Sequence, residues 1–136
     1  MEIRYAVSSV MSKDIVSVNT TATLSLATKL MVENDIGSLV VTEGHEMIGI
    51  LTERDVLKQF CFDPECASMK VGDVMSSPLI TIDSDAAIGQ AADLMAERKI
   101  RRLLVTDEGE IRGIITERDL MRATLDVFRK LSDAWV

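Results

Sequence analysis

Several kinds of residue are scarce in this sequence, and each scarcity argues against a class of protein. Aromatic residues make up 4% of the chain, which predicts a core of aliphatic side chains. With two cysteines and one histidine, the chain lacks the usual four ligands of a structural zinc site. No apolar run approaches the ~20 residues of a membrane span, and the N-terminus shows no signal-peptide pattern. We therefore expect a cytoplasmic protein without a membrane contact.

Positive charge is also in the minority. The 136 residues carry a net charge of −7, and such a balance repels nucleic acid and anionic lipid. A basic run over 98–102 is the local exception, but no aromatic residues interleave with it as in nucleic-acid-binding surfaces. Nucleic acid is therefore not an expected partner.

The two cysteines, Cys61 and Cys66, lie close together in the segment FCFDPEC. Free thiols are the expectation for a reducing compartment. A disulfide, or a metal shared between two copies of the chain, remains an alternative.

Groups that carry catalysis are few. The single histidine, His45, falls in a polar turn where exposure is expected. Glu53 and Glu117 lie in the first turns of predicted helices, where a favourable interaction with the helix dipole is enough to account for an acidic residue. No glycine-rich phosphate loop is present. The sequence therefore predicts neither a catalytic site nor a metal site.

What the chain does contain is an internal repeat. A shift of 64 residues aligns Val10–Lys58 with Val74–Arg122 without a gap, and nineteen of the forty-nine aligned residues are identical. Such self-similarity indicates a duplicated structural unit.

Each repeat has the pattern β-α-β-β-α. A β-branched run comes first, then the polar residues Asn19-Thr20-Thr21 as a predicted helix cap, and then apolar residues at helical spacing. Two strands around a tight turn and a second helix complete the unit. The pattern predicts an α/β (α+β) fold. The predicted organisation is repeat 1 over 7–58, a linker over 59–70, repeat 2 over 71–122 and a helical extension over 123–136.

The last predicted helix, which begins before the extension and continues through it, carries an apolar stripe at helical spacing. It covers the module's own core or contacts a partner subunit, and the sequence leaves both open. Its residues are Leu120, Thr124, Val127, Phe128, Leu131 and Trp135.

Both repeats end in the same motif, Gly-apolar-apolar-Thr-x-x-Asp, with Thr52 and Asp55 in the first and Thr116 and Asp119 in the second. A threonine followed three residues later by an acidic residue is a helix-capping box. The same geometry presents free N–H groups, a hydroxyl and a carboxylate, which suit a phosphate and a ribose diol. Retention of the motif in both copies favours a role in binding.

These residues resemble a known family. The Val-Met-Ser segment, the apolar strand, the helix with its Leu-Met pair and the Gly-x-x-Thr-x-x-Asp ending, twice in order, resemble a pair of cystathionine-β-synthase (CBS) domains, or Bateman module. The resemblance covers about 7–122. It implies two repeats packed sheet-to-sheet about a pseudo-twofold axis, with two clefts that typically hold AMP, ADP, ATP or S-adenosylmethionine. It also implies a homodimer and a regulatory role exerted on a separate effector protein.

The resemblance also assigns ligand-binding residues by position. The aspartates would hold ribose hydroxyls, the threonines would line the ribose or phosphate, and the strand residues would meet the base. The full set is Val16, Ser17, Ile36, Gly37, Thr52, Arg54 and Asp55 in the first repeat, and Ile80, Thr81, Ile100, Arg101, Arg102, Thr116, Arg118 and Asp119 in the second.

The two sets differ in charge. Arg98-Lys99-Ile100-Arg101-Arg102 stands where the first repeat has Asn34-Asp35-Ile36-Gly37-Ser38, and Arg112 replaces Ile48. A basic run is often a solvated helix end, but cations beside a strand edge suit a phosphate. We therefore expect the Asp119 site to prefer phosphorylated nucleotides, and the Asp55 site to bind more weakly or to suit a less anionic adenosine compound. The alternative for the whole chain is a non-catalytic scaffold dimer with vestigial clefts.

Overall fold

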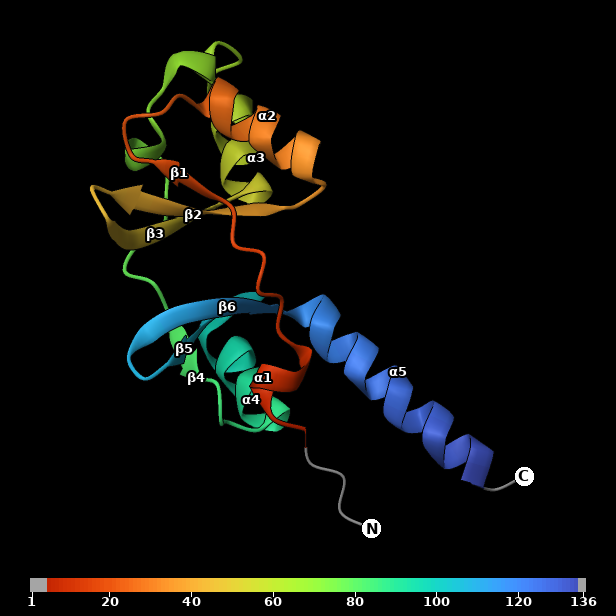
Figure 1. Ribbon diagram of the computed structural model, residues 1–136. Coiled ribbons are helices and arrows are strands. Elements are labelled where there is room, and N and C mark those ends of the chain that lie inside the picture. Colours follow the sequence, from red (N-terminus) through yellow and green to blue (C-terminus); the bar gives the residue numbers. More distant parts are fainter. Residues whose placement is uncertain (1–4, 135–136) are drawn as a thin grey trace. The chain divides into compact units, whose positions relative to one another are not determined.

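The computed structural model describes residues 5–134, which divide into two compact units. The central unit is Ile15–Leu79, and the terminal unit combines the described part of Met1–Asp14 with that of Ile80–Val136. Each unit contains one three-stranded sheet with helices beside it (Figure 1). This confirms the predicted α+β fold of two similar halves.

The central unit has a mixed sheet in the order β1-β2-β3. Strand β1 is parallel to β2, and β2 is antiparallel to β3. Its elements are β1 (Ser17–Asn19), α2 (Leu24–Asn34), β2 (Ser38–Glu43), β3 (Glu46–Thr52), α3 (Glu53–Phe62) and the short 3-10 turns η1 (Cys66–Ser68) and η2 (Val71–Asp73).

The terminal unit repeats this sheet in the order β4-β5-β6, with every strand pair in the equivalent register. Ser17 pairs with Val40 in one sheet, and Thr81 pairs with Leu104 in the other. The elements of this unit are α1 (Val7–Val10), β4 (Thr81–Asp83), α4 (Ile88–Arg98), β5 (Arg102–Asp107), β6 (Glu110–Thr116) and α5 (Glu117–Ala134).

The cores are aliphatic, as the scarcity of aromatic residues predicts. In the central unit one face of α2 buries Ala27 and Met31 against Leu39 and Val41 of β2. Equivalent residues form the second core, which consists of Ala91, Met95, Leu103, Val105 and Ile115 together with Val7. Helical spacing on α2 and α4 and alternation on the strands place these side chains inward.

Each sheet is completed by a segment from the other repeat. We call residues 6–12 arm 1 and residues 70–76 arm 2; the 64-residue shift superimposes them. Arm 1 belongs to the terminal unit, where Ser12 exchanges backbone hydrogen bonds of 2.9 Å with Ile114. Arm 2 belongs to the central unit, where Ser76 bonds to Ile50 in the same way. The compact units therefore follow different boundaries from the sequence repeats.

The arms bury one valine each. Val7 and Val71 occupy equivalent positions, both are 0% exposed, and each lies in the core formed by the other repeat. Their amides donate to Ala86 O and Ala22 O, again at equivalent positions.

Two local predictions differ from the structure. The cap of α2 is Thr23, whose hydroxyl accepts from the Leu26 amide, because the Asn19 side chain instead accepts from Thr21 in a turn before the helix. Helix α3 runs on to Phe62, so part of the predicted linker is helical. Trp135 of the predicted stripe lies outside the described residues.

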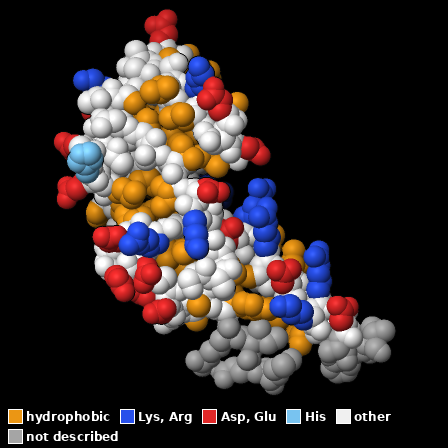
Figure 2. All heavy atoms as spheres, in the orientation of Figure 1, with side chains coloured by type: hydrophobic (Ala, Val, Ile, Leu, Met, Phe, Trp, Pro, Cys, Tyr) orange, Lys and Arg blue, Asp and Glu red, His pale blue; other side chains and the backbone are white. Residues whose placement is uncertain are grey.

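His45 and the two cysteines lie as the sequence predicts. His45 lies exposed at the β2–β3 turn, where Figure 2 shows the pale-blue side chain at the surface. Both cysteines are free, with Cys61 exposed and Cys66 buried. Among residues 5–134 no helix is both long and apolar enough to span a membrane.

Candidate functional site

The predicted binding residues of the central unit gather at one edge of its sheet. Because β1 runs parallel to β2 and β3 runs antiparallel, the starts of β1 and β2 meet the end of β3 at the same edge. Ser38 pairs with Thr52 there, and the Val40 amide donates to Val16 O at 3.0 Å. The Glu53 amide donates to Gly37 O at 2.9 Å, which ties the start of α3 to the turn before β2.

The terminal unit builds the same edge from its own residues. Arg102 pairs with Thr116, and the Leu104 amide donates to Ile80 O at 3.1 Å. The Glu117 amide donates to Arg101 O at 2.8 Å. The strand ends and the helix start therefore coincide in both units, and all fifteen residues assigned from the sequence lie at or beside one of these two edges.

The capping box is formed at both edges. Asp55 Oδ2 accepts from the Thr52 amide at 2.9 Å, and Thr52 Oγ1 accepts from the Asp55 amide at 3.1 Å. In the other unit Asp119 Oδ2 accepts from both the Thr116 amide, at 2.8 Å, and the Thr116 hydroxyl, at 3.0 Å.

Capping and ligand binding do not compete for the same atom. Capping occupies Oδ2, and an ionised carboxylate has a second oxygen, Oδ1, with further acceptor sites. Thr52, Asp55, Thr116 and Asp119 are half-buried, so their positions are held while part of each side chain faces solvent. The box therefore fixes a carboxylate beside the first N–H groups of a helix, a suitable arrangement for a diol and an anion.

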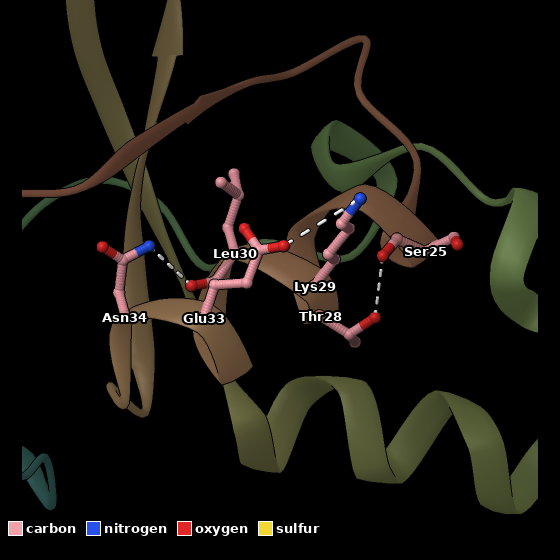
Figure 3. Close-up of polar contacts among 6 residues, drawn as sticks. All are labelled: Ser25, Thr28, Lys29, Leu30, Glu33 and Asn34. Carbon is pink, nitrogen blue, oxygen red and sulfur yellow. Dashed lines mark hydrogen bonds and ion pairs between the residues drawn. The ribbon is translucent and has the colours of Figure 1, made fainter.

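The turn before β2 is held by the end of α2. The Ile36 amide donates to Met31 O at 3.0 Å, which satisfies a carbonyl in the last turn of the helix. Asn34 Nδ2 donates to Leu30 O at 2.8 Å, one turn back along the helix (Figure 3). Asp35 then adopts a left-handed conformation with φ 51° and leads the chain into Ile36 and Gly37. Lys99 has the same role in the terminal unit, with φ 56°.

The charges at these two turns have opposite sign. Residues 34–38 contain one acidic residue, Asp35, for a formal charge of −1. Residues 98–102 contain four basic residues, Arg98, Lys99, Arg101 and Arg102, for +4, so the two turns differ by five charges. On an equivalent backbone, the turn of the terminal unit is therefore strongly basic and that of the central unit is weakly acidic.

Not every arginine singled out by the sequence lies at that edge. Arg112 lies near the β5–β6 turn, about 13 Å along the strand from Thr116. Its Nη2 pairs with Glu110 Oε2 at 2.7 Å. Arg101 does lie at the edge, where its Nε is 3.8 Å from Glu117 Oε2. Both side chains are exposed, so this contact is weak and leaves Arg101 able to turn to a ligand.

Sequence reasoning overlooked the arms as neighbours of the site. Ser76 of arm 2 bonds to Ile50, two residues before Thr52, and Ser12 of arm 1 bonds to Ile114 in the same relation to Thr116. The repeat of Val-Met-Ser in the sequence indicates that this segment has a structural role. It does not indicate which of the two sheets each copy completes.

Comparison with known families and proteins agrees with this architecture. The family model for the CBS domain matches residues 7–61 and 71–126. A CBS domain-containing protein from Bacillus subtilis, YhcV, is 29% identical over 115 residues, which are 85% of this chain and 82% of that protein. An uncharacterized protein from Methanopyrus kandleri, MK0525, is 37% identical over 86% of this chain, which spans 61% of its length.

Solved structures agree as well. An uncharacterized conserved protein from Pyrococcus horikoshii is 30% identical, with a TM-score of 0.82 over 91% of this chain and 95% of that one. The CBS domain pair of protein MJ0100, solved with 5′-methylthioadenosine and S-adenosyl-L-methionine, is 22% identical, with a TM-score of 0.79 over 90% of this chain and 97% of that one. At that identity the likeness concerns the fold.

Proposed function

The chain belongs to the CBS-domain family, and on that premise we propose that it is a regulatory module that binds an adenosine ligand and signals to a separate protein. A pair of CBS domains is a regulatory module, and we assign no catalytic role to it. The proposed ligands are AMP, ADP, ATP or S-adenosylmethionine, bound in the cytoplasm by a homodimer.

One observation carries this proposal: the Thr–Asp box is formed in both units beside a helix start and two strand starts. A cap alone needs only one of several residues at the threonine position. Both copies nevertheless retain the same threonine and aspartate, with the same amide-to-carboxylate bond of 2.8–2.9 Å. The adenosine compounds in the related MJ0100 structure support the ligand class.

The charges of the two turns refine the proposal. The cations Lys99, Arg101 and Arg102 suit a phosphate at the Asp119 edge. The Asp55 edge, with Asp35 in place of Lys99, suits a neutral or cationic adenosine compound such as methylthioadenosine or S-adenosylmethionine. The two edges would thus bind different adenosine compounds.

The test separates capping from binding. Asp55→Asn and Asp119→Asn keep an oxygen that accepts from the threonine amide, but they remove the charge and exchange one acceptor for a donor. Asp→Ala at the same positions removes both functions. Binding of AMP, ATP and S-adenosylmethionine is measured by calorimetry, and the melting temperature is measured without ligand.

A binding role predicts that each Asn variant melts near the wild-type temperature while losing affinity for one ligand by roughly tenfold or more. The Ala variants should also lose about 1 kcal/mol of stability. If no adenosine compound binds the wild type at millimolar concentration, the box is a cap alone.

The scaffold alternative then becomes the better account. It rests on a separate observation, the exposed apolar residues on α3 and α5, which include Leu57, Met121 and Phe128. Those residues serve an interaction whether or not a ligand binds.

A further inference from the structure

Glu53 and Glu117 are equivalent acidic residues that the capping box does not use. Each is the first residue of its helix and comes directly after the threonine of the box. The box is closed by the aspartate two residues further on, as in the bond from the Thr116 amide to Asp119 Oδ2. A favourable interaction with the helix dipole applies to both glutamates equally, so a difference in what they contact points to a difference in role.

The two glutamates meet different residues at the turn that precedes the middle strand of each sheet. In the terminal unit the Glu117 amide donates to Arg101 O at 2.8 Å, and Glu117 Oε2 lies 3.8 Å from Arg101 Nε. In the central unit the Glu53 amide donates to Gly37 O at 2.9 Å, and glycine presents no side chain to the carboxylate. The same backbone bond therefore sets one glutamate beside a guanidinium and the other beside bare backbone.

The side-chain contact between Glu117 and Arg101 is weak enough to be exchanged. The two side chains are 66% and 71% exposed, and 3.8 Å is too long for a hydrogen bond. Such an ion pair is screened by salt and contributes little to stability. The backbone bond keeps the two residues adjacent whichever partner the guanidinium has. A new partner can therefore take Arg101 without disturbing the start of α5.

A phosphate is the partner that would compete with this carboxylate. Both groups are anionic, and both accept hydrogen bonds from the planar N–H groups of an arginine. While Glu117 holds Arg101, a phosphate at this edge has to displace it. A ligand without a phosphate, such as adenosine, makes no demand on the arginine and is not opposed in this way.

We propose that Glu117 is a positioning residue for Arg101, and that it sets how strongly the Asp119 edge favours phosphorylated ligands over uncharged adenosine. This inference rests on the adenosine-binding function proposed above and adds the residue that regulates its selectivity. Without ligand the Glu117 carboxylate keeps Arg101 at the start of α5, and in the complex the phosphate replaces that carboxylate. Glu117 therefore lowers the affinity for phosphate-bearing ligands alone.

Glu117→Gln tests this role, because it removes the charge and keeps the length and the hydrogen-bonding capacity of the side chain. Binding of ATP and of adenosine is measured by calorimetry at low salt, in an Asp55→Asn background that weakens the other edge. ATP affinity should rise about threefold, as expected for the loss of a competing exposed ion pair. Adenosine affinity should not change.

The matched control is Glu53→Gln, which makes the same change in net charge at the equivalent position of α3. Residue 37 has no side chain to release, so ATP affinity at the Asp119 edge should stay as it was. An equal gain in the control would show that net charge, and not the contact with Arg101, governs the affinity, and would overturn the proposal.

Two further measurements separate positioning of the arginine from plain charge repulsion. In an Arg101→Ala background, Glu117→Gln should lose its effect on ATP affinity, because the contact is already absent. By NMR, the Nε–H signal of Arg101 should move in ligand-free Glu117→Gln, and in the wild type it should move when ATP is added. A gain in ATP affinity that persists without Arg101 would contradict the proposed role.

The remaining outcomes distinguish this proposal from the function on which it rests. If ATP binds the wild type and Glu117→Gln equally well, or if adenosine gains as much as ATP, the role of Glu117 is wrong and adenosine binding stands. If the wild type binds neither compound at millimolar concentration, the proposed function fails and the role of Glu117 fails with it.

Discussion

The central and terminal units place the same residues on an equivalent backbone and surround them differently. The threonine and aspartate of the box, and the amide bond to the preceding turn, are common to both. The turn itself carries Asp35 in one unit and Lys99 in the other, with the same left-handed conformation. The shared residues thus set the geometry of the edge, and the residues free to vary set its charge.

The units also differ in what completes them. Each is completed by the arm at the start of the other repeat, so the two repeats depend on each other even though each unit has its own core. Only the terminal unit depends on a segment at the start of the chain. A change in that segment should therefore destabilise the terminal unit and leave the central unit intact.

Deletion of residues 1–13 should have the largest effect. It removes the fully buried Val7 and several backbone hydrogen bonds to Ser84, Ala86 and Ile114. Losing these contacts should cost the terminal unit about 4 kcal/mol. Hydrogen exchange measured by mass spectrometry should show faster exchange in α4, β5 and β6, with α2, β2 and β3 still protected. Equal acceleration in both units would contradict this division.

A smaller loss should follow from one added methyl group at the contact between arm and sheet. A Cβ on Gly113 would lie 2.7 Å from Met11 Sδ and from Ser12 O, and a Cβ on Gly49 would meet Met75 and Ser76 at the same distances. Gly113→Ala and Gly49→Ala should each cost about 1–3 kcal/mol, because the arm must move. Urea denaturation measures the free energy of unfolding.

The control is Gly89→Ala, in α4, where an added Cβ meets no atom within 4 Å. This change should stabilise the protein by about 0.5–1 kcal/mol, since alanine favours a helix more than glycine does. A loss of stability in the control comparable to that in Gly113→Ala would show that the arm contact is not the cause.

The charge difference leads to a prediction about affinity. Lys99→Asp combined with Arg101→Ala gives the terminal edge a turn closer to that of the central unit. Affinity for ATP at the Asp119 edge should fall about tenfold, and affinity for adenosine should change little, because only the phosphates meet the missing cations. Calorimetry with both ligands measures the change.

Arg112→Ala combined with Arg129→Ala and Arg122→Ala changes the net charge by the same three units and is the control; of these residues, Arg112 pairs with Glu110 near the hairpin turn. It removes three positive charges from the same unit and none from the turn, and ATP affinity should remain unchanged. Equal losses in the control and in the double variant would mean that net charge, rather than the position of the cations, governs binding.

Much of the fold and of the candidate site could be predicted from the sequence, because the duplication shows the pattern of each strand and helix in two copies. Hydrophobic spacing identified the strands and helices, and the Thr-x-x-Asp spacing identified the box formed at Thr52 and Asp55. The place of Arg112 was missed because it was grouped with the other arginines by charge. Its separation from Thr116, four residues along a predicted strand or about 13 Å, already placed it away from the edge.

That each arm packs against the core of the other repeat could not be predicted, for a different reason. Val7 and Val71 are the same residue at equivalent positions, so either could fill either core. The helix cap was mispredicted because Asn19 and Thr23 are both good caps. The Asn19 side chain is engaged by Thr21 in the preceding turn, which leaves Thr23 to cap α2.

The smallest expected effect concerns a contact made possible by the length of α5. Lys130 Nζ donates to Tyr5 Oη at 3.0 Å, and the ammonium lies 5.5 Å from the ring centroid. The hydrogen bond that Lys130 donates to Tyr5, followed by the electrostatic interaction with the same tyrosine, raises the pKa of Lys130 above the usual 10.5. In the shorter α3 no equivalent contact can form, because the position equivalent to Lys130 is Cys66, beyond the helix end.

Tyr5→Phe should lower the pKa of Lys130 towards its usual value without a measurable change in melting temperature at pH 7. A raised pKa stabilises the folded state fully below pH 10.5, and that contribution is lost as the pH rises through the folded-state pKa. The Lys130 ammonium is exposed to solvent, so the effect of the contact on stability is small. An NMR titration of Lys130 measures the shift, and Tyr5→Leu, which also removes the ring, separates the hydroxyl from the cation–π contact. An unchanged Lys130 pKa in Tyr5→Phe would show that the tyrosine hydroxyl does not hold the end of α5.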